Sequence, residues 1–138
     1  MPKLEEAVYG YLSGEPGVAS LVGDRIYPGR VKEGATLPAI SYQRISANRT
    51  YTYDSFADTS AWVRARVQFN CWSNTPLQAI EVGEAVLLAL SGYTGDMSGE
   101  YIGQSSAELE LDDYDGPTKL YRRVVDFFIT YEDESATS

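Results

Sequence analysis

The most regular pattern in the chain lies in residues 61–92, where alternating positions are followed by helically spaced ones. Every second side chain of the first part is apolar (Val63, Ala65, Val67, Phe69, Cys71) and the intervening ones are polar (Arg64, Arg66, Gln68, Asn70). Strict alternation over residues 63–71 predicts a β-strand with one buried face. The pattern therefore places the apolar set in a core and the arginines outside it.

Residues 76–90 predict a helix that follows this strand directly. Thr75 is a suitable N-cap, Pro76 suits the first helical position, and Gln78 completes a capping box. Gly92 stands where a helix C-cap belongs. The core stripe is predicted to comprise Ile80, Gly83, Val86, Leu87 and Leu90, with Gly83 closely approaching a sheet. Leu77 and Leu88 lie opposite this stripe, either as scattered surface residues or as the edge of a subunit contact.

Three further strands and a short helix complete the prediction. Residues 3–12 have helical spacing, and residues 37–46, 101–112 and 120–132 are predicted strands, the last two joined as an antiparallel hairpin. In that hairpin, Glu110 is expected opposite Arg122. We expect an α+β fold whose mostly antiparallel sheet of four to five strands carries one long helix and a short N-terminal helix packed on one face. Residues 1–138 are expected to form a single domain that ends in a frayed tail at 132–138.

Residues 47–60 form a polar connection without clear periodicity, and it carries the aromatic residues Tyr51, Tyr53 and Phe56. A connection of this length is unusual inside a compact domain, and such segments are commonly functional or mobile. One interpretation is a hairpin extension with one packed aromatic residue. The other is an arm that becomes ordered only against a partner, because tyrosine is enriched at interfaces.

Composition restricts the functions that remain. The chain has no histidine, which removes the commonest general base and metal ligand, and its net charge of −9 disfavours adhesion to nucleic acid or to an anionic membrane. Cys71 is the single cysteine, so no internal disulfide forms, and its place on the apolar face indicates a buried thiol. No cofactor-binding loop is present, and no cofactor is expected.

The one cluster with possible metal chemistry is acidic and lies in the strand at 101–112. Glu108, Glu110 and Asp112 alternate along it, so their carboxylates are expected on one face, opposite Ala107, Leu109 and Leu111. Three interpretations remain: a metal site, a solvated face balanced by neighbouring arginines, and an acidic surface or channel. The metal site is the least favoured, because the order of residues differs from that of an EF-hand loop.

A second group of residues has the character of an interface. Trp62, Arg64 and Arg66 lie on the outward side of the strand at 61–72, and tryptophan and arginine are typical hot-spot residues. Val124 and Phe128 give the last strand a second apolar face, which indicates that something covers both sides of the sheet there. Together with Tyr51, Tyr53 and Phe56, these residues are the predicted subunit contacts.

Five segments in a fixed order carry a family resemblance. They are the N-terminal helix with residues 21–28 (LVGDRIYP), residues 37–43 (LPAISYQ), 66–72 (RVQFNCW) with the helix at 79–90, 108–114 (ELELDDY) and 121–131 (YRRVVDFFITY). In this order and spacing, the chain resembles the tail-completion proteins of long-tailed bacteriophages, also called tail terminator or tail-to-head joining proteins. The resemblance implies an α+β subunit of a hexameric ring that caps the tail tube at the head connector. It implies neither enzymatic activity nor a cofactor, and the family has no catalytic residues to transfer.

The resulting hypothesis is a structural virion protein that ends tail-tube polymerisation and joins tail to head. Its partners would be further copies of itself, the tail-tube protein and head connector or neck proteins, with no membrane involved. It would be assembled in the cytoplasm of the host bacterium. DNA would pass through the ring without specific binding, past an acidic lumen formed by Glu108, Glu110 and Asp112. The alternatives are a head-side neck protein (a stopper or adaptor) and, less favoured, a metal-dependent hydrolase that uses the same carboxylates.

Overall fold

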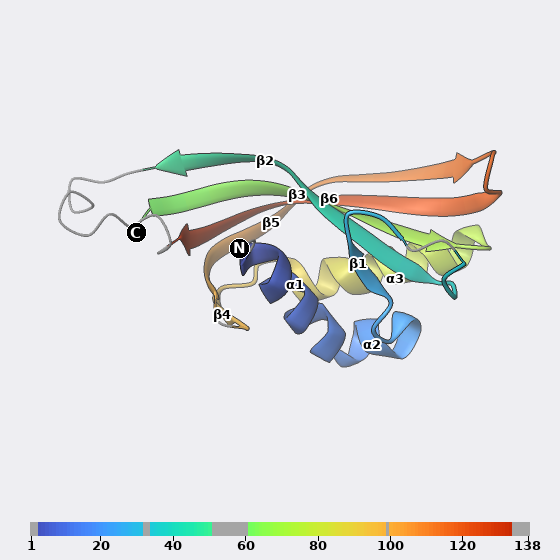
Figure 1. Cartoon of the computed structure of the whole chain (residues 1–138), viewed down its shortest axis with the longest axis horizontal. Helices are drawn as coiled ribbons and strands as arrows, with labels where there is room; N and C mark the ends of the chain where they lie inside the picture. Colours follow the sequence, from blue (N-terminus) through green and yellow to red (C-terminus); the bar gives the residue numbers. More distant parts are fainter. Residues whose placement is uncertain (1–2, 32–33, 51–60, 99, 134–138) are drawn as a thin grey trace.

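In the computed structural model, described for all residues except 1–2, 32–33, 51–60, 99 and 134–138, three helices lie on one side of a curled sheet (Figure 1). The helices are α1 (Lys3–Gly14), α2 (Pro16–Val22) and α3 (Pro76–Leu90). The strands are β1 (Ile26–Pro28), β2 (Ala39–Thr50), β3 (Ala61–Ser73), β4 (Gly95–Met97), β5 (Glu100–Asp115) and β6 (Leu120–Asp133). The α+β class and the helical layer on one face are as the sequence predicts, but the layer also contains α2, whereas only one long and one short helix were expected.

The sheet has six strands in the described residues, in the order β1-β2-β3-β6-β5-β4. This corrects the expected four to five strands, because two strands of three residues each lie at the sheet's edges. One of them, β4, lies between the predicted helix at 76–90 and the predicted strand at 101–112, where no strand was expected. β1 pairs with β2 in parallel, and every other pair is antiparallel. None of the described helices is both long enough and apolar enough to cross a membrane.

The core lies between the sheet and the helices, on the face that the alternation in β3 predicts. Val63, Ala65, Val67, Phe69 and Cys71 are all buried. Phe69 packs edge-on against Phe127 and stacks on Tyr42, each at 5.8 Å between ring centroids. Tyr42 also donates a hydrogen bond of 2.6 Å to the Glu5 carbonyl, which fastens α1 to the sheet. The predicted strand and the helix that follows it are confirmed as β3 and α3.

The ends of α3 agree with the prediction, whereas its buried stripe is rotated. The Thr75 hydroxyl accepts a hydrogen bond from the Gln78 backbone N–H, and Gly92 follows the helix with φ of 72°. The Gln78 side chain accepts a hydrogen bond from the Ser73 hydroxyl, and that hydroxyl accepts one from the Thr75 N–H. Ser73 therefore links the two groups that a capping box would join directly. The buried set is Ala79, Val82, Gly83, Val86 and Leu90, while Ile80 and Leu87 are only half-buried.

Gly83 lies at the contact between α3 and the sheet. A Cβ placed at Gly83 would collide with Cγ of Arg123 on β6, so the helix rests directly on that side chain. The predicted close approach to the sheet is confirmed.

β2 is longer than predicted and is interrupted once. It ends at Thr50, so residues 47–50 belong to the strand, and the rest of the predicted arm lies outside the described residues. The register shifts between Arg44 and Ser46, which leaves Ile45 as an extra residue with 45% of its surface exposed. This β-bulge is the reason that Ile45 is out of phase in the sequence. Two comparable shifts occur in β5, at Gly103 and Glu108.

Candidate assembly surface

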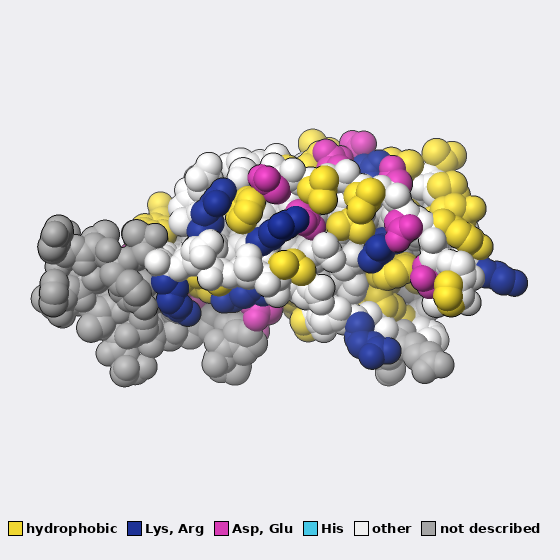
Figure 2. Space-filling view, turned by 90° about the horizontal axis from the view of Figure 1, so that it is seen from above, with side chains coloured by type: hydrophobic (Ala, Val, Ile, Leu, Met, Phe, Trp, Pro, Cys, Tyr) yellow, Lys and Arg dark blue, Asp and Glu magenta, His cyan; other side chains and the backbone are white. Residues whose placement is uncertain are grey.

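The face of the sheet that carries no helix is formed by the outward residues of the four long strands. Figure 2 shows it from above, with arginine, acidic and apolar side chains intermixed. Trp62, Arg64 and Arg66 of β3 lie on this face, opposite the buried side of their strand. Val124 and Phe128 of β6 pair with Asn70 and Arg66 and therefore share it. The structure thus places these five predicted interface residues on one face, spread along the strands and with Val124 buried, whereas Tyr51, Tyr53 and Phe56 lie outside the described residues.

Arg66 is anchored by a buried acid that the sequence reasoning missed. Its Nε and Nη2 donate to Oδ2 of Asp126 on β6 at 3.0 and 2.6 Å, and Asp126 is fully buried. The sequence carried a signal for this pair, because Asp126 lies among the apolar residues Val124, Val125, Phe127 and Phe128. An aspartate in such a stretch is expected to be buried, and a buried aspartate rarely lacks a partner. Asp126 fixes the direction of the Arg66 guanidinium on this surface.

Arg64 and Trp62 are also in contact within the subunit. The Arg64 guanidinium lies 3.8 Å from the centroid of the Phe128 ring, a cation–π geometry. Trp62 packs edge-on against Tyr101 at 6.2 Å and rests on Gly103, where an added Cβ would come within 2.9 Å of the indole. These contacts hold both side chains against the sheet while Arg64 remains exposed, so less conformational entropy is lost when a partner binds.

The acidic strand differs from its predicted arrangement. The register pairs Glu110 with Val125, Asp112 with Arg123 and Asp113 with Arg122, which corrects the expected pair of Glu110 and Arg122. The extra residue Glu108 shifts the faces, so Glu110 and Asp112 lie on the helix side with Ala107. Leu109 and Leu111 lie on the helix-free face, 44% and 49% exposed. A one-residue bulge reverses every facing assignment beyond it.

Arginines of β6 pair with three acids of this strand. Arg123 donates to both carboxylate oxygens of Asp112, at 2.6 and 3.0 Å, and to Glu110 at 3.3 Å. These hydrogen bonds from Arg123 lower the pKa of Asp112. Arg122 pairs with Asp113 at 2.7 Å. Of the three predicted residues, Glu110 and Asp112 thus share an arginine, and in the described part of the chain no three acidic or cysteine side chains are grouped as metal ligands.

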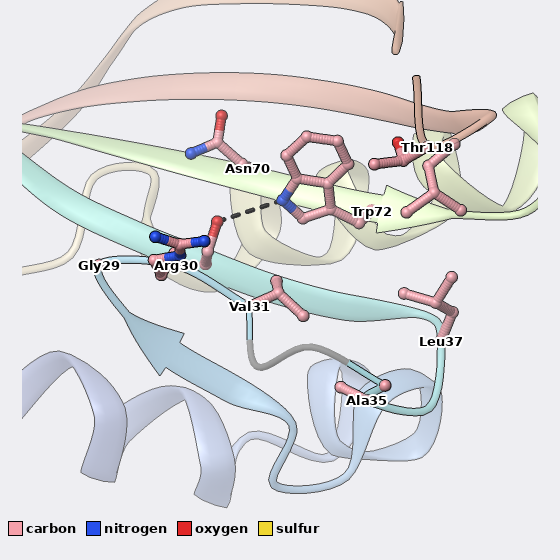
Figure 3. Close-up of a pocket in the computed structure, with 11 residues that line it drawn as sticks. Gly29, Arg30, Val31, Ala35, Leu37, Asn70, Trp72 and Thr118 are labelled. Carbon is pink, nitrogen blue, oxygen red and sulfur yellow. Dashed lines mark hydrogen bonds between the residues drawn. The ribbon is translucent and has the colours of Figure 1, made fainter. Parts of the chain in front are cut away.

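A cavity of about 450 Å³ opens at the hairpin end of the sheet, between the loop before β2 and the β5–β6 turn. Trp72 of β3 lines it and donates a hydrogen bond of 3.2 Å to the Ser41 hydroxyl (Figure 3). Leu37 and Leu120 give its wall an apolar character. Arg122 lies 5.3 Å from the centroid of the indole ring. Its lining is largely apolar, and no pattern in the sequence predicted it.

One face of the sheet is covered by helices, and the other carries arginines, aromatic rings and exposed leucines, residue types that occur at protein interfaces. The chain belongs to the family described as tail completion protein gp17, whose model matches residues 6–132. A chain from the virion of a native gene transfer agent particle has the same fold, with a TM-score of 0.70 and 19% sequence identity. The match covers 94% of this chain and 95% of that chain. No curated protein matches the chain.

Proposed function

We propose that this protein forms a hexameric ring at the head-proximal end of a phage tail, where it ends tail-tube polymerisation and joins tail to head. The family match over residues 6–132 carries the proposal, because it spans the sheet and the helical layer together. The ring would be assembled in the cytoplasm of the host bacterium and retained in the virion. Its partners would be the tail-tube protein on one side and head connector or neck proteins on the other.

The division of the sheet into two faces supports this role. The helix side holds the subunit together, and the helix-free face presents Trp62, Arg64 and Arg66, whose residue types recur at interface hot spots. Arg64 is the exposed member of this set and is held in place by Phe128. For that reason, we assign Arg64 to the contact with a neighbouring subunit or with another partner.

The acidic lumen remains a prediction, but its three predicted residues do not contribute equally to it. Arg123 balances Glu110 and Asp112, whereas Glu108 is exposed at the bulge and has no ion pair among the described residues. The net charge of −9 nevertheless repels a polyanion from the ring as a whole. DNA would therefore pass without specific binding.

Light scattering after size-exclusion chromatography tests the ring, with the protein alone and with purified tail-tube protein. We expect a mass six times the 15.2 kDa of one chain, alone or on the tube end. Electron microscopy of growing tubes should show shorter tubes, capped at one end, as the protein is added. A monomer under both conditions, with unchanged tube lengths, would refute the proposal.

Two controls sharpen the assignment. Arg64→Glu should weaken assembly, whereas the same change at Arg30, an exposed arginine in the loop before β2, should leave it unchanged. Separate pull-downs with tail-tube protein and with connector protein identify the neighbours. Binding to the connector alone would place the protein among the head-side neck proteins instead.

A further inference from the structure

The sheet has an open edge on each side. β1 pairs only with Ile40–Tyr42 of β2, and β4 only with Glu100–Ile102 of β5. Beyond these pairs, no strand in the described part of the chain lies along the outer edge of residues 43–50 or of residues 106–115. The backbone groups of an open edge are a template for a strand from another chain.

The two open edges differ in their charged residues. Residues 43–50 of β2 contain two arginines and no acid, whereas residues 106–115 of β5 contain five acids and no base. Within the chain, Arg44 pairs with Glu5, and Arg122 and Arg123 pair with three of those five acids. Two arginines cannot balance five acids, so two β5 edges would repel each other, whereas a β2 edge brings no acid to the contact.

The positions of the two edge segments along the sheet also fit a ring of copies that closes on itself. Residues 43–50 lie level with residues 62–68 of β3, and residues 106–114 lie level, through β6, with residues 66–73. If the centres of the two segments are paired, each copy is shifted relative to the next by about 15 Å along the strands, at ~3.4 Å per residue. A sheet of four long strands per copy repeats every ~19 Å. Its strands would tilt by about 40°, within the range of about 35–45° found in closed sheets.

We propose that residues 43–50 of one copy pair antiparallel with residues 106–115 of the next copy, so that one sheet runs continuously around the ring. This inference rests on the ring of the proposed function and names the contact that forms it. Two different edges meet, so the contact is head-to-tail and repeats in one direction until the rotation closes. Centred pairing places Asn48 opposite Leu109, both on the helix-free face.

Disulfide trapping tests this register. The double variant Asn48→Cys/Leu109→Cys cannot close a bond within one chain, because three strand spacings of ~4.8 Å exceed the ~7 Å limit between Cα atoms. Oxidation should therefore give a ladder of covalent multimers that ends at the ring size and collapses on reduction. Each single variant should give dimers at most. The control Asn48→Cys/Leu88→Cys uses a residue that is 81% exposed on α3, away from both edges, and should give no ladder.

Hydrogen–deuterium exchange tests the contact without assuming a register. Outward amides in both segments should exchange slowly in assembled protein and rapidly in subunits dissociated by dilution. A ladder, or protection in both segments, supports the edge contact. A ring with neither result overturns the edge contact and leaves the proposed function standing. Protein that stays monomeric, alone and with tail-tube protein, overturns both.

Discussion

Replacing Arg66 by methionine should be strongly destabilising, although Arg66 lies on the sheet's outer face. Asp126 is fully buried, its Oδ2 accepts both hydrogen bonds from Arg66, and its Oδ1 has no hydrogen-bond partner in the structure. Removing one member of a buried pair costs about 3–5 kcal/mol. Because 37% of the Arg66 side chain remains exposed, we expect Arg66→Met to lower the free energy of unfolding by about 3 kcal/mol, the lower end of that range.

Urea unfolding followed by circular dichroism measures this loss. With a slope of about 1.5–2 kcal/mol/M for a chain of this size, the midpoint should fall by about 1.5–2 M. All variants are compared at one protein concentration, because assembly would otherwise contribute to the apparent stability. The matched control is Arg64→Met, which loses only a cation–π contact with Phe128, worth about 0.5–1 kcal/mol.

A double variant separates the buried charge from the lost packing. Arg66→Met/Asp126→Leu removes both charges, and it should recover most of the stability because no unpaired carboxylate remains. Equal midpoints for Arg66→Met and Arg64→Met would refute the reasoning. A double variant no more stable than Arg66→Met would do the same, since the loss would then come from packing alone.

Three further predictions follow from the helices and from the thiol. Gly83→Ala should destabilise by about 1–2 kcal/mol in thermal unfolding, because its Cβ meets the Arg123 side chain, whereas Gly17→Ala in α2, with nothing within 4 Å, should be neutral or stabilising. Thr75→Ala should cost about 1 kcal/mol by the same measurement through loss of the N-cap, and Thr75→Ser should restore it. Burial raises the pKa of Cys71 from 9.0 to about 12, so Ellman's reagent at pH 8 should label the thiol only after unfolding. A raised thiol pKa stabilises the folded state below the unfolded pKa, so this contribution should be lost as pH rises from 9.0 towards 12; rapid labelling of folded protein would contradict the burial.

Periodicity predicted the centre of the fold because burial there is one-sided. In β3 buried residues alternate with more exposed ones from Val63 to Phe69, so one sheet face follows directly from the sequence. The capping residues of α3 are equally local, and both of its ends were predicted. The stripe of α3 was rotated because small residues such as Ala79 weigh little in a hydrophobic pattern, although they are the ones that fit closest to the sheet.

The acidic strand could not be predicted because a bulge leaves no compositional mark. Glu108 continues the alternation in the sequence, and only strand pairing shows that it is the extra residue. The exposed leucines were therefore assigned to the wrong face. The same limitation applies to the surface as a whole: the outward arginines were identified from β3, whereas Asp126, the partner of Arg66, lies 60 residues later in the chain. Long-range partners of this kind depend on the strand order.

Because of the three bulges, the sheet's curvature can change while each side chain stays on the same face of the sheet. Ile45, Gly103 and Glu108 each stand between two residues that pair with adjacent partner positions. Deleting any one of them would restore an uninterrupted ladder and leave every remaining side chain on its present face. Because bulges increase local twist, such deletions would flatten the sheet without altering its core. Single-residue insertions and deletions at these positions thus give evolution, or a designer, a way to adjust curvature in small steps.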